Sequence, residues 1–245
     1  MFTILLIAVA VILLTIALVW IVDKFLPTKL KPVLLIGLWI LIGFLGYQTY
    51  MSIYEPIKFN KLKNNRYAKV IERLVDIRDA QLAHKQITGK FAGNFDDLIT
   101  FIDTAQFTIT QRRDSTVKDV EASKSYGVDM FKDITLTDTL GFVPVKDSLF
   151  KGSDRYKTMM NVPVGEQGAK FKMESGLINQ NDVNIPVFEA SVKKDIILFD
   201  QNKDLLVQEN QVMSVDAVNG DALKVGSMTE VNTSGNWPKV YGSNE

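Results

Sequence analysis

The chain contains no cysteine and a single histidine, His84. Without cysteine it can form no disulfide, zinc–thiolate or iron–sulfur site, and it has no thiol nucleophile or lipid-modified cysteine anchor. One imidazole excludes any site that needs two histidines from this chain. Basic and acidic residues are equal, at 28 each, so no overall positive charge points to nucleic acid. We therefore expect no cofactor, no metal and no nucleic-acid partner.

Charge is also nearly absent from residues 1–55, in contrast to the polar remainder. Within them, residues 2–22 and 33–54 are apolar runs of membrane length, because a helix rising about 1.5 Å per residue crosses a ~30 Å hydrocarbon core with roughly 20 residues. The connector 23–32 is short, so the two helices should be antiparallel neighbours. The sequence predicts a transmembrane hairpin. A cleaved signal peptide is the alternative for the first run, disfavoured because no basic segment precedes it.

Basic residues follow the second apolar run, and we expect them to contact lipid headgroups. Counting positive charges favours a cytoplasmic head, but long domains translocate largely regardless of charge, so charge leaves the side of the membrane open. The expected headgroup contacts are Lys58, Lys61, Lys63 and Arg66.

Residues 64–88 have apolar positions at steps of three and four, which predicts a helix with one apolar stripe. Pro56 disfavours a straight helix across the membrane boundary. Gly89 is placed to end the helix, and Asn94 to cap a second, short one. The charged face of the long helix is the expected docking surface for partner proteins. Its candidate partner-binding residues are Glu72, Arg73, Asp76 and Asp79.

The second half of the chain is rich in strand patterns. Alternation predicts strands at 107–113, 134–140 and 169–175. Residues 185–192 are the expected return strand of a hairpin whose turn region comprises Gly176 and then residues 179–184. Asn219-Gly220 is a turn signal between Val215–Val218 and Leu223–Val225. Residues 114–133 are a polar connection, either a mobile insertion or a short helix near 117–122.

These segments predict an α+β head in which the long helix packs on an antiparallel sheet. The expected division is 1–55 for the two membrane helices, 56–106 for the juxtamembrane segment and head helices, 107–229 for the strand-rich part, and 230–245 for a polar tail. In the tail, Trp237 is either a partner-recognition anchor or, as we favour, a ring packed against the domain edge.

Residues 33–102 resemble the front end of type IV pilins and type II secretion pseudopilins. The resemblance is carried by a membrane helix, a long helix with Val70, Leu74, Ile77 and Ala80, a turn at 88–92 and a short helix around Asp96-Asp97-Leu98. It implies a pilin-like periplasmic head that binds partner proteins. No prepilin-type processing site precedes the second apolar run, so pilin-type polymerisation is not implied.

The whole chain also resembles an uncharacterised, membrane-anchored family associated with Bacteroidota-type bacteria. With the pilin-like segment, this resemblance implies a multi-pass protein of the bacterial inner membrane with a periplasmic head. The segments that carry it are EPIKFNK (55–61), RYAKVIERLVDIRDAQ (66–81), FVPVKDSLF (142–150) and LKVGSMTEVNTSGNWP (223–238).

No motif in the sequence points to an enzyme. Ser153-Asp154 has no partner histidine, and His84 ends the apolar stripe, where a structural role is expected. Four aspartates, Asp76, Asp79, Asp96 and Asp97, could converge on calcium, but they lack EF-hand spacing.

We therefore expect a non-enzymatic scaffold or accessory subunit of a cell-envelope assembly, such as a secretion or export machine. Its expected partners are membrane lipids and other envelope proteins in a multi-subunit complex. The alternative is a ligand-sensing or ligand-binding membrane module with a pocket between helix and sheet. An enzyme that uses carboxylates such as Asp76 or Asp79 is a third hypothesis.

Overall fold

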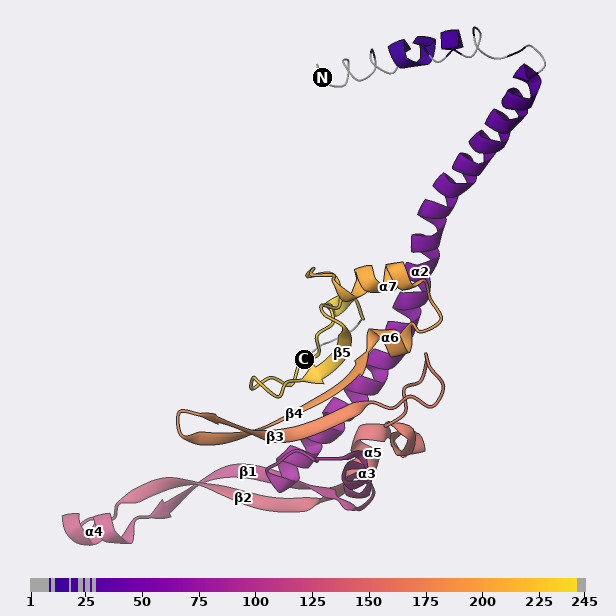
Figure 1. Ribbon diagram of the computed structural model, residues 1–245. Coiled ribbons are helices and arrows are strands. Elements are labelled where there is room, and N and C mark those ends of the chain that lie inside the picture. Colours follow the sequence, from indigo (N-terminus) through magenta and orange to yellow (C-terminus); the bar gives the residue numbers. More distant parts are fainter. Residues whose placement is uncertain are drawn as a thin grey trace. The chain divides into compact units, whose positions relative to one another are not determined.

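The computed structural model describes residues 30–241 and, before them, residues 9, 12–17, 19–21, 24 and 27 (Figure 1). It divides into two compact units, Met1–Lys58 and Phe59–Glu245. About half of the first predicted membrane helix, 2–22, and half of its connector, 23–32, lie outside the described residues. Residues 9, 12–17 and 19–21 are described and helical.

Helix α2 spans Lys31–Thr88, 58 residues with Pro56 inside. It is the one helix among the described residues that is long and apolar enough to cross a membrane. The structure thus supports one candidate span and does not support a multi-pass arrangement. The prediction that the head helix begins near Asn64 is wrong. Pro56 has no backbone N–H, so the helix lacks one hydrogen bond, the one to the carbonyl four residues earlier. A long helix has many other such bonds and therefore continues past the proline.

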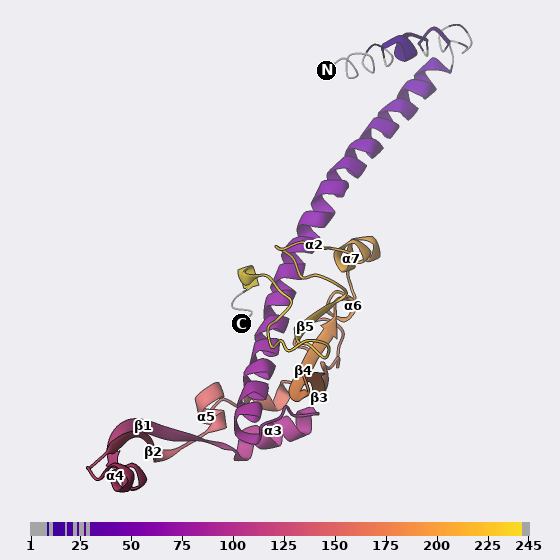
Figure 2. The ribbon, with the colours of Figure 1, turned by 90° about the vertical axis from the view of Figure 1, so that its left-hand side faces the viewer.

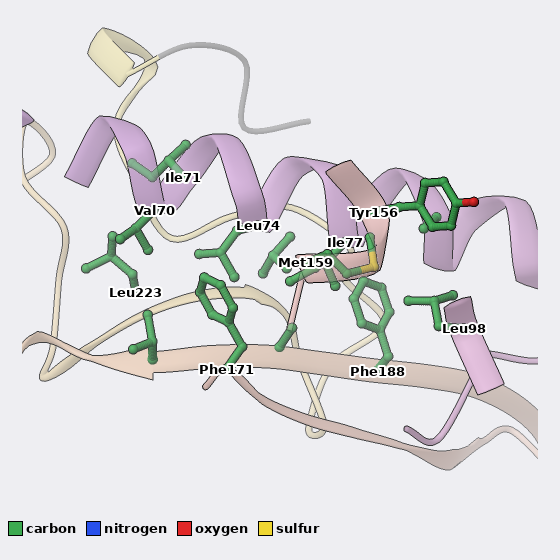
Figure 3. Close-up of a cluster of buried hydrophobic side chains, with 14 of the residues drawn as sticks. Val70, Ile71, Leu74, Ile77, Leu98, Tyr156, Met159, Phe171, Phe188 and Leu223 are labelled. Carbon is green, nitrogen blue, oxygen red and sulfur yellow. The ribbon is translucent and has the colours of Figure 1, made fainter. Parts of the chain in front are cut away.

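In the second unit, the apolar stripe of α2 packs on a three-stranded antiparallel sheet (Figure 3). The sheet consists of β3 (Lys172–Gln180), β4 (Val183–Lys193) and β5 (Ala222–Gly226), in the order β3-β4-β5. This confirms the predicted α+β head with a long helix on an antiparallel sheet. The side chains that meet at this interface include Val70, Leu74, Ile77, Phe171, Phe188 and Leu223, all buried.

The β3–β4 hairpin confirms the predicted pair of strands, and its turn lies within the predicted turn region. Gly176 lies within β3 and pairs with Val187. The turn is made by Asn181 and Asp182, whose φ angles are 51° and 63°. Asparagine and aspartate tolerate this left-handed region, which a two-residue hairpin loop requires at both positions. The turn thus falls inside the predicted residues 179–184, while Gly176 is a strand residue. Residues 215–218, predicted to be a strand, are not one.

Short helices close one end of the head. Gly89, with φ of +78°, follows the end of α2. Helix α3 (Phe95–Thr104) begins at Asn94, whose Oδ1 accepts a hydrogen bond from the backbone N–H of Asp97 at 2.8 Å. Both predictions are confirmed. The remaining short elements are α5 (Val145–Phe150), η1 (Asp154–Thr158), α6 (Lys194–Ile197), α7 (Lys203–Asn210) and η2 (Lys239–Tyr241).

Residues 106–144 form a separate two-stranded ribbon, here called the arm (Figure 2). Strand β1 (Gln106–Lys118) pairs antiparallel with β2 (Phe131–Pro144), and helix α4 (Val120–Tyr126) lies at the tip. The prediction for residues 114–133 is partly right: helix α4 overlaps the short helix expected near 117–122, but β1 and β2 extend into the two ends of this segment. The outer parts of the two strands face each other with polar side chains. The sequence therefore shows no apolar alternation there that would have signalled a strand.

Candidate functional site

A buried ionic cluster joins α7 to α2. Lys194 Nζ donates to the carbonyl oxygens of Glu209 and Val218, each at 2.8 Å, and lies 3.3 Å from Glu209 Oε1. Tyr67 Oη donates to the same Oε1 at 3.2 Å, and Lys63 pairs with Oε2 at 2.8 Å. Burial lowers the pKa of Lys194, and burial together with the charge of Glu209 raises the pKa of Tyr67. Since Lys194 has no exposed surface, the cluster fastens the fold and is closed to substrates.

Two of the four predicted headgroup contacts have partners within the head. Lys63 binds Glu209, and Arg66 Nη2 donates to Asp200 Oδ2 at 2.8 Å while its Nη1 donates to the Ile197 carbonyl at 2.7 Å. These pairs were not predicted, because their members are more than 130 residues apart in sequence. Lys58 and Lys61 are exposed.

The predicted charged docking face of α2 is not one surface. Asp76 is buried and accepts a hydrogen bond from Arg155 Nη2 at 3.0 Å. Its pKa is raised by burial, against the lowering effect of Arg155. Arg73 donates to the Arg155 carbonyl at 3.1 Å, and Asp79 is half-buried. Of the predicted residues, Glu72 is exposed, Arg73 and Asp79 are partly buried and Asp76 is buried. The role of this face as a docking surface stays a prediction.

His84 has the structural role that the sequence predicted. Its Nδ1–H donates to the Lys90 carbonyl at 2.6 Å, and its ring meets Phe101 edge-on, with centroids 4.7 Å apart. These contacts hold the turn after α2 against α3. Within the described part of the chain, no group of three or more histidine, aspartate or glutamate side chains is placed to hold a metal ion.

Trp237 is 2% exposed, which agrees with packing at the domain edge rather than with a surface anchor. Its ring lies against Gly235 so closely that a Cβ there would sit 2.3 Å from the ring. Trp237, Val215 and Val240 line a groove of about 590 Å³ at the surface. The predicted pocket between helix and sheet is instead filled by apolar side chains (Figure 3).

The arm carries a group of large exposed apolar side chains on its strands and on helix α4. None of its residues, 106–144, belongs to the buried core. The register of the two strands shifts between Ile109 and Thr110. Ile109 pairs with Gly141 and Thr110 with Thr139, so Leu140 has no partner on the opposite strand. The exposed fractions are 71% for Val120, 73% for Tyr126, 62% for Phe131, 64% for Leu140 and 63% for Phe142.

Charges on the arm are largely used within it. Arg113 pairs with Asp138 at 3.0 Å across the strands, and Lys132 with Asp119 at 3.5 Å. Thr116 also donates to Asp133 at 2.7 Å. The apolar side chains of the arm take no part in these pairs and stay exposed. Sequence reasoning did not single them out, although Tyr126, Phe131 and Val120 were visible as apolar residues within a polar stretch.

Comparison of the chain with protein-family models, curated proteins and solved structures finds no match. The account of function therefore rests on the geometry of the described residues.

Proposed function

We propose that the protein is a non-enzymatic scaffold or accessory subunit of a bacterial cell-envelope assembly. It is anchored in the inner membrane and binds partner proteins through its head. The arm is a long ribbon that exposes aromatic and aliphatic side chains and contributes no fully buried residue to the core, although Phe107 at its base packs against it. This is the observation that carries the proposal.

The physical state of the arm supports a protein partner. Two-stranded ribbons are marginally stable in water, and both outer edges of β1–β2 present unpaired backbone groups in this two-stranded sheet. A partner strand added to either edge would satisfy these groups, while Phe131 and Phe142 would supply the apolar contacts. Exposed aromatic residues are also the type that dominates binding energy at protein interfaces.

The anchor in this proposal is the apolar part of α2, with residues 2–22 as a second span that completes the hairpin. The pilin-like resemblance favours a periplasmic head. The cysteine-free chain permits a direct test, because Leu177→Cys, at an exposed position on β3, would be the sole thiol. A membrane-impermeant maleimide should label this variant in intact spheroplasts. Labelling only after lysis would place the head in the cytoplasm.

The partner proposal is tested by purifying the full chain in mild detergent beside the variants Phe131→Ser and Phe142→Ser. We expect stoichiometric partners with the natural chain and their loss from both variants. Leu177→Ser is the matched control, since it removes an equally exposed apolar side chain outside the arm. Equal recovery of the partners with all four chains would contradict a role for the arm.

The groove lined by Val215, Trp237 and Val240 supports ligand binding as the second candidate function. It is open, and it combines apolar side chains with the amides of Asn219 and Asn236. A thermal-shift screen with envelope metabolites would show a rise in melting temperature that Val215→Asp abolishes. A screen without such a rise would leave the scaffold as the better account.

A further inference from the structure

Five apolar side chains at one end of the head are more than half exposed. We call them the rim. Their exposed fractions are 56% for Phe199, 54% for Val207, 91% for Met213, 92% for Val215 and 84% for Val240. Val215 and Val240 line the same surface groove. Exposure of so many large apolar groups to water is costly, which indicates that something else covers them.

The rim lies on segments that are fastened to the start of the head's part of α2. Asp200, next to Phe199, binds Arg66. Glu209 of α7, the helix that carries Val207, binds Lys63.

The third segment is the C-terminal one, where Tyr241 Oη donates to Asn64 Oδ1 at 2.7 Å beside Val240. All three attachments thus fall within residues 63–66. Both ribbon views show α7 beside α2 (Figures 1 and 2).

Chain length keeps these attachment points close to the apolar run. Tyr54 ends that run, and Lys63 follows it by nine residues. Nine residues span at most about 30 Å when fully extended and about 14 Å when helical. Whatever the orientation of the two units, the rim segments are therefore tethered near the boundary of any membrane that holds α2.

The charges around the rim suit an anionic lipid surface. Lys58 and Lys61 are exposed between the apolar run and the rim, and Lys203 and Lys239 are exposed next to it. Exposed carboxylates in the same segments are Glu55, Asp195, Asp204 and Asp216, while Asp200 is held by Arg66. The four lysines are therefore available to anionic headgroups without being in excess over the carboxylates. Apolar side chains flanked by lysines are typical of surfaces that lie in the headgroup region.

We propose that the rim is a lipid-facing surface, whose apolar side chains insert into the headgroup region of the bilayer that holds α2. This inference rests on the membrane anchor of the proposed function and is independent of the arm. It assigns the rim a fixed role: the head is docked on the membrane by its rim, in addition to its covalent tether.

The test uses the full chain in nanodiscs of phosphatidylcholine and phosphatidylglycerol, one copy per disc. Met213→Cys, Val215→Cys and Val240→Cys would each carry an environment-sensitive fluorophore at the sole thiol. The matched controls are Leu177→Cys and Val120→Cys, which are similarly exposed but lie on β3 and on the arm. Spin-labelled lipids should quench the rim probes by roughly half or more and leave the controls nearly unchanged.

The other outcomes overturn the inference in distinguishable ways. Rim probes that behave like the controls would show that the rim is in water. Blue-shifted emission that lipids do not quench would show that protein covers it. A chain that does not remain with the nanodisc would overturn the membrane anchor, and with it the inference that the rim faces lipid. Failure of the arm variants to lose partners would bear on the proposed function alone.

Discussion

Lys194 Nζ lies 3.3 Å from Glu209 Oε1, and both side chains are buried, at 0% and 4% exposed. A charge pair in this environment is stable only while every polar group around it is satisfied. Here the two backbone carbonyls, Tyr67 and Lys63 complete the set. The cluster therefore ties α7 and the loop before β5 to α2.

Removal of Lys194 should destabilise the head strongly. Lys194→Met leaves two buried carbonyls without a donor and Glu209 with one cation fewer, so we expect a loss of about 3 kcal/mol in the free energy of unfolding. Urea unfolding followed by circular dichroism measures it. Lys203→Met, on the exposed side of α7, should change stability by less than about 0.5 kcal/mol. Equal midpoints for the two variants would contradict the role of the cluster.

The Arg66–Asp200 pair should make stability depend on pH in the acid range. The hydrogen bonds from Arg66 lower the pKa of Asp200 from 3.8 to about 2. The unfolded chain therefore binds more protons between these values, and stability falls as the pH falls from about 4 to about 2. Asp200→Asn should remove this part of the dependence.

The measurement is the difference in unfolding free energy between the natural chain and Asp200→Asn, taken at several pH values from 5 to 2. It should be small, because the Asp200 side chain is 40% exposed, and it should shrink towards pH 2. A difference that is constant with pH would show that the pair does not shift the carboxyl group.

Gly226 is required by two features at once. Its φ is +77°, and a Cβ there would lie 2.2 Å from the carbonyl oxygen of Phe188. Gly226→Ala should therefore cost more than the roughly 1–3 kcal/mol of backbone strain alone. Gly220→Ala is the control, because φ is +83° but a Cβ would meet nothing within 4 Å. Similar melting temperatures for the two variants would contradict the close approach of β5 to Phe188.

The arm should be dispensable for folding. Replacement of residues 111–138 by a short glycine–serine turn removes no residue of the buried core. We expect the urea midpoint of the head to change little and the recovery of partners to be lost. A head that unfolds on this deletion would mean that the arm serves the fold rather than a partner.

The core of the fold follows from local patterns. The apolar stripe of α2, the cap at Asn94 and the alternation in β4 each predict their element, because each signal lies within a few residues. The strand pattern also agrees with burial: Phe171 is buried, whereas Lys172 and Glu174 pair with each other at 2.8 Å on the exposed side.

The arm and the ion pairs depend on contacts between distant residues, which no local pattern encodes. Arg155 reaches Asp76 over 79 positions, and Lys63 reaches Glu209 over 146. The charged face of α2 was predicted to be exposed because its neighbours in the fold were unknown. In the arm, charged pairs such as Arg113–Asp138 replace the apolar alternation that signals a strand. Nor did the local pattern indicate that α2 continues through Pro56, because the other hydrogen bonds of so long a helix outweigh the one that the proline removes.

The proposal that the arm binds a protein is tested most directly by photocrosslinking in native membranes. A benzophenone amino acid would replace Phe131 or Phe142 in the full chain, with Leu177 as the control position. The account predicts a discrete crosslinked product from both arm positions and none from Leu177. Arm positions that crosslink no protein, or all three positions giving the same products, would contradict it.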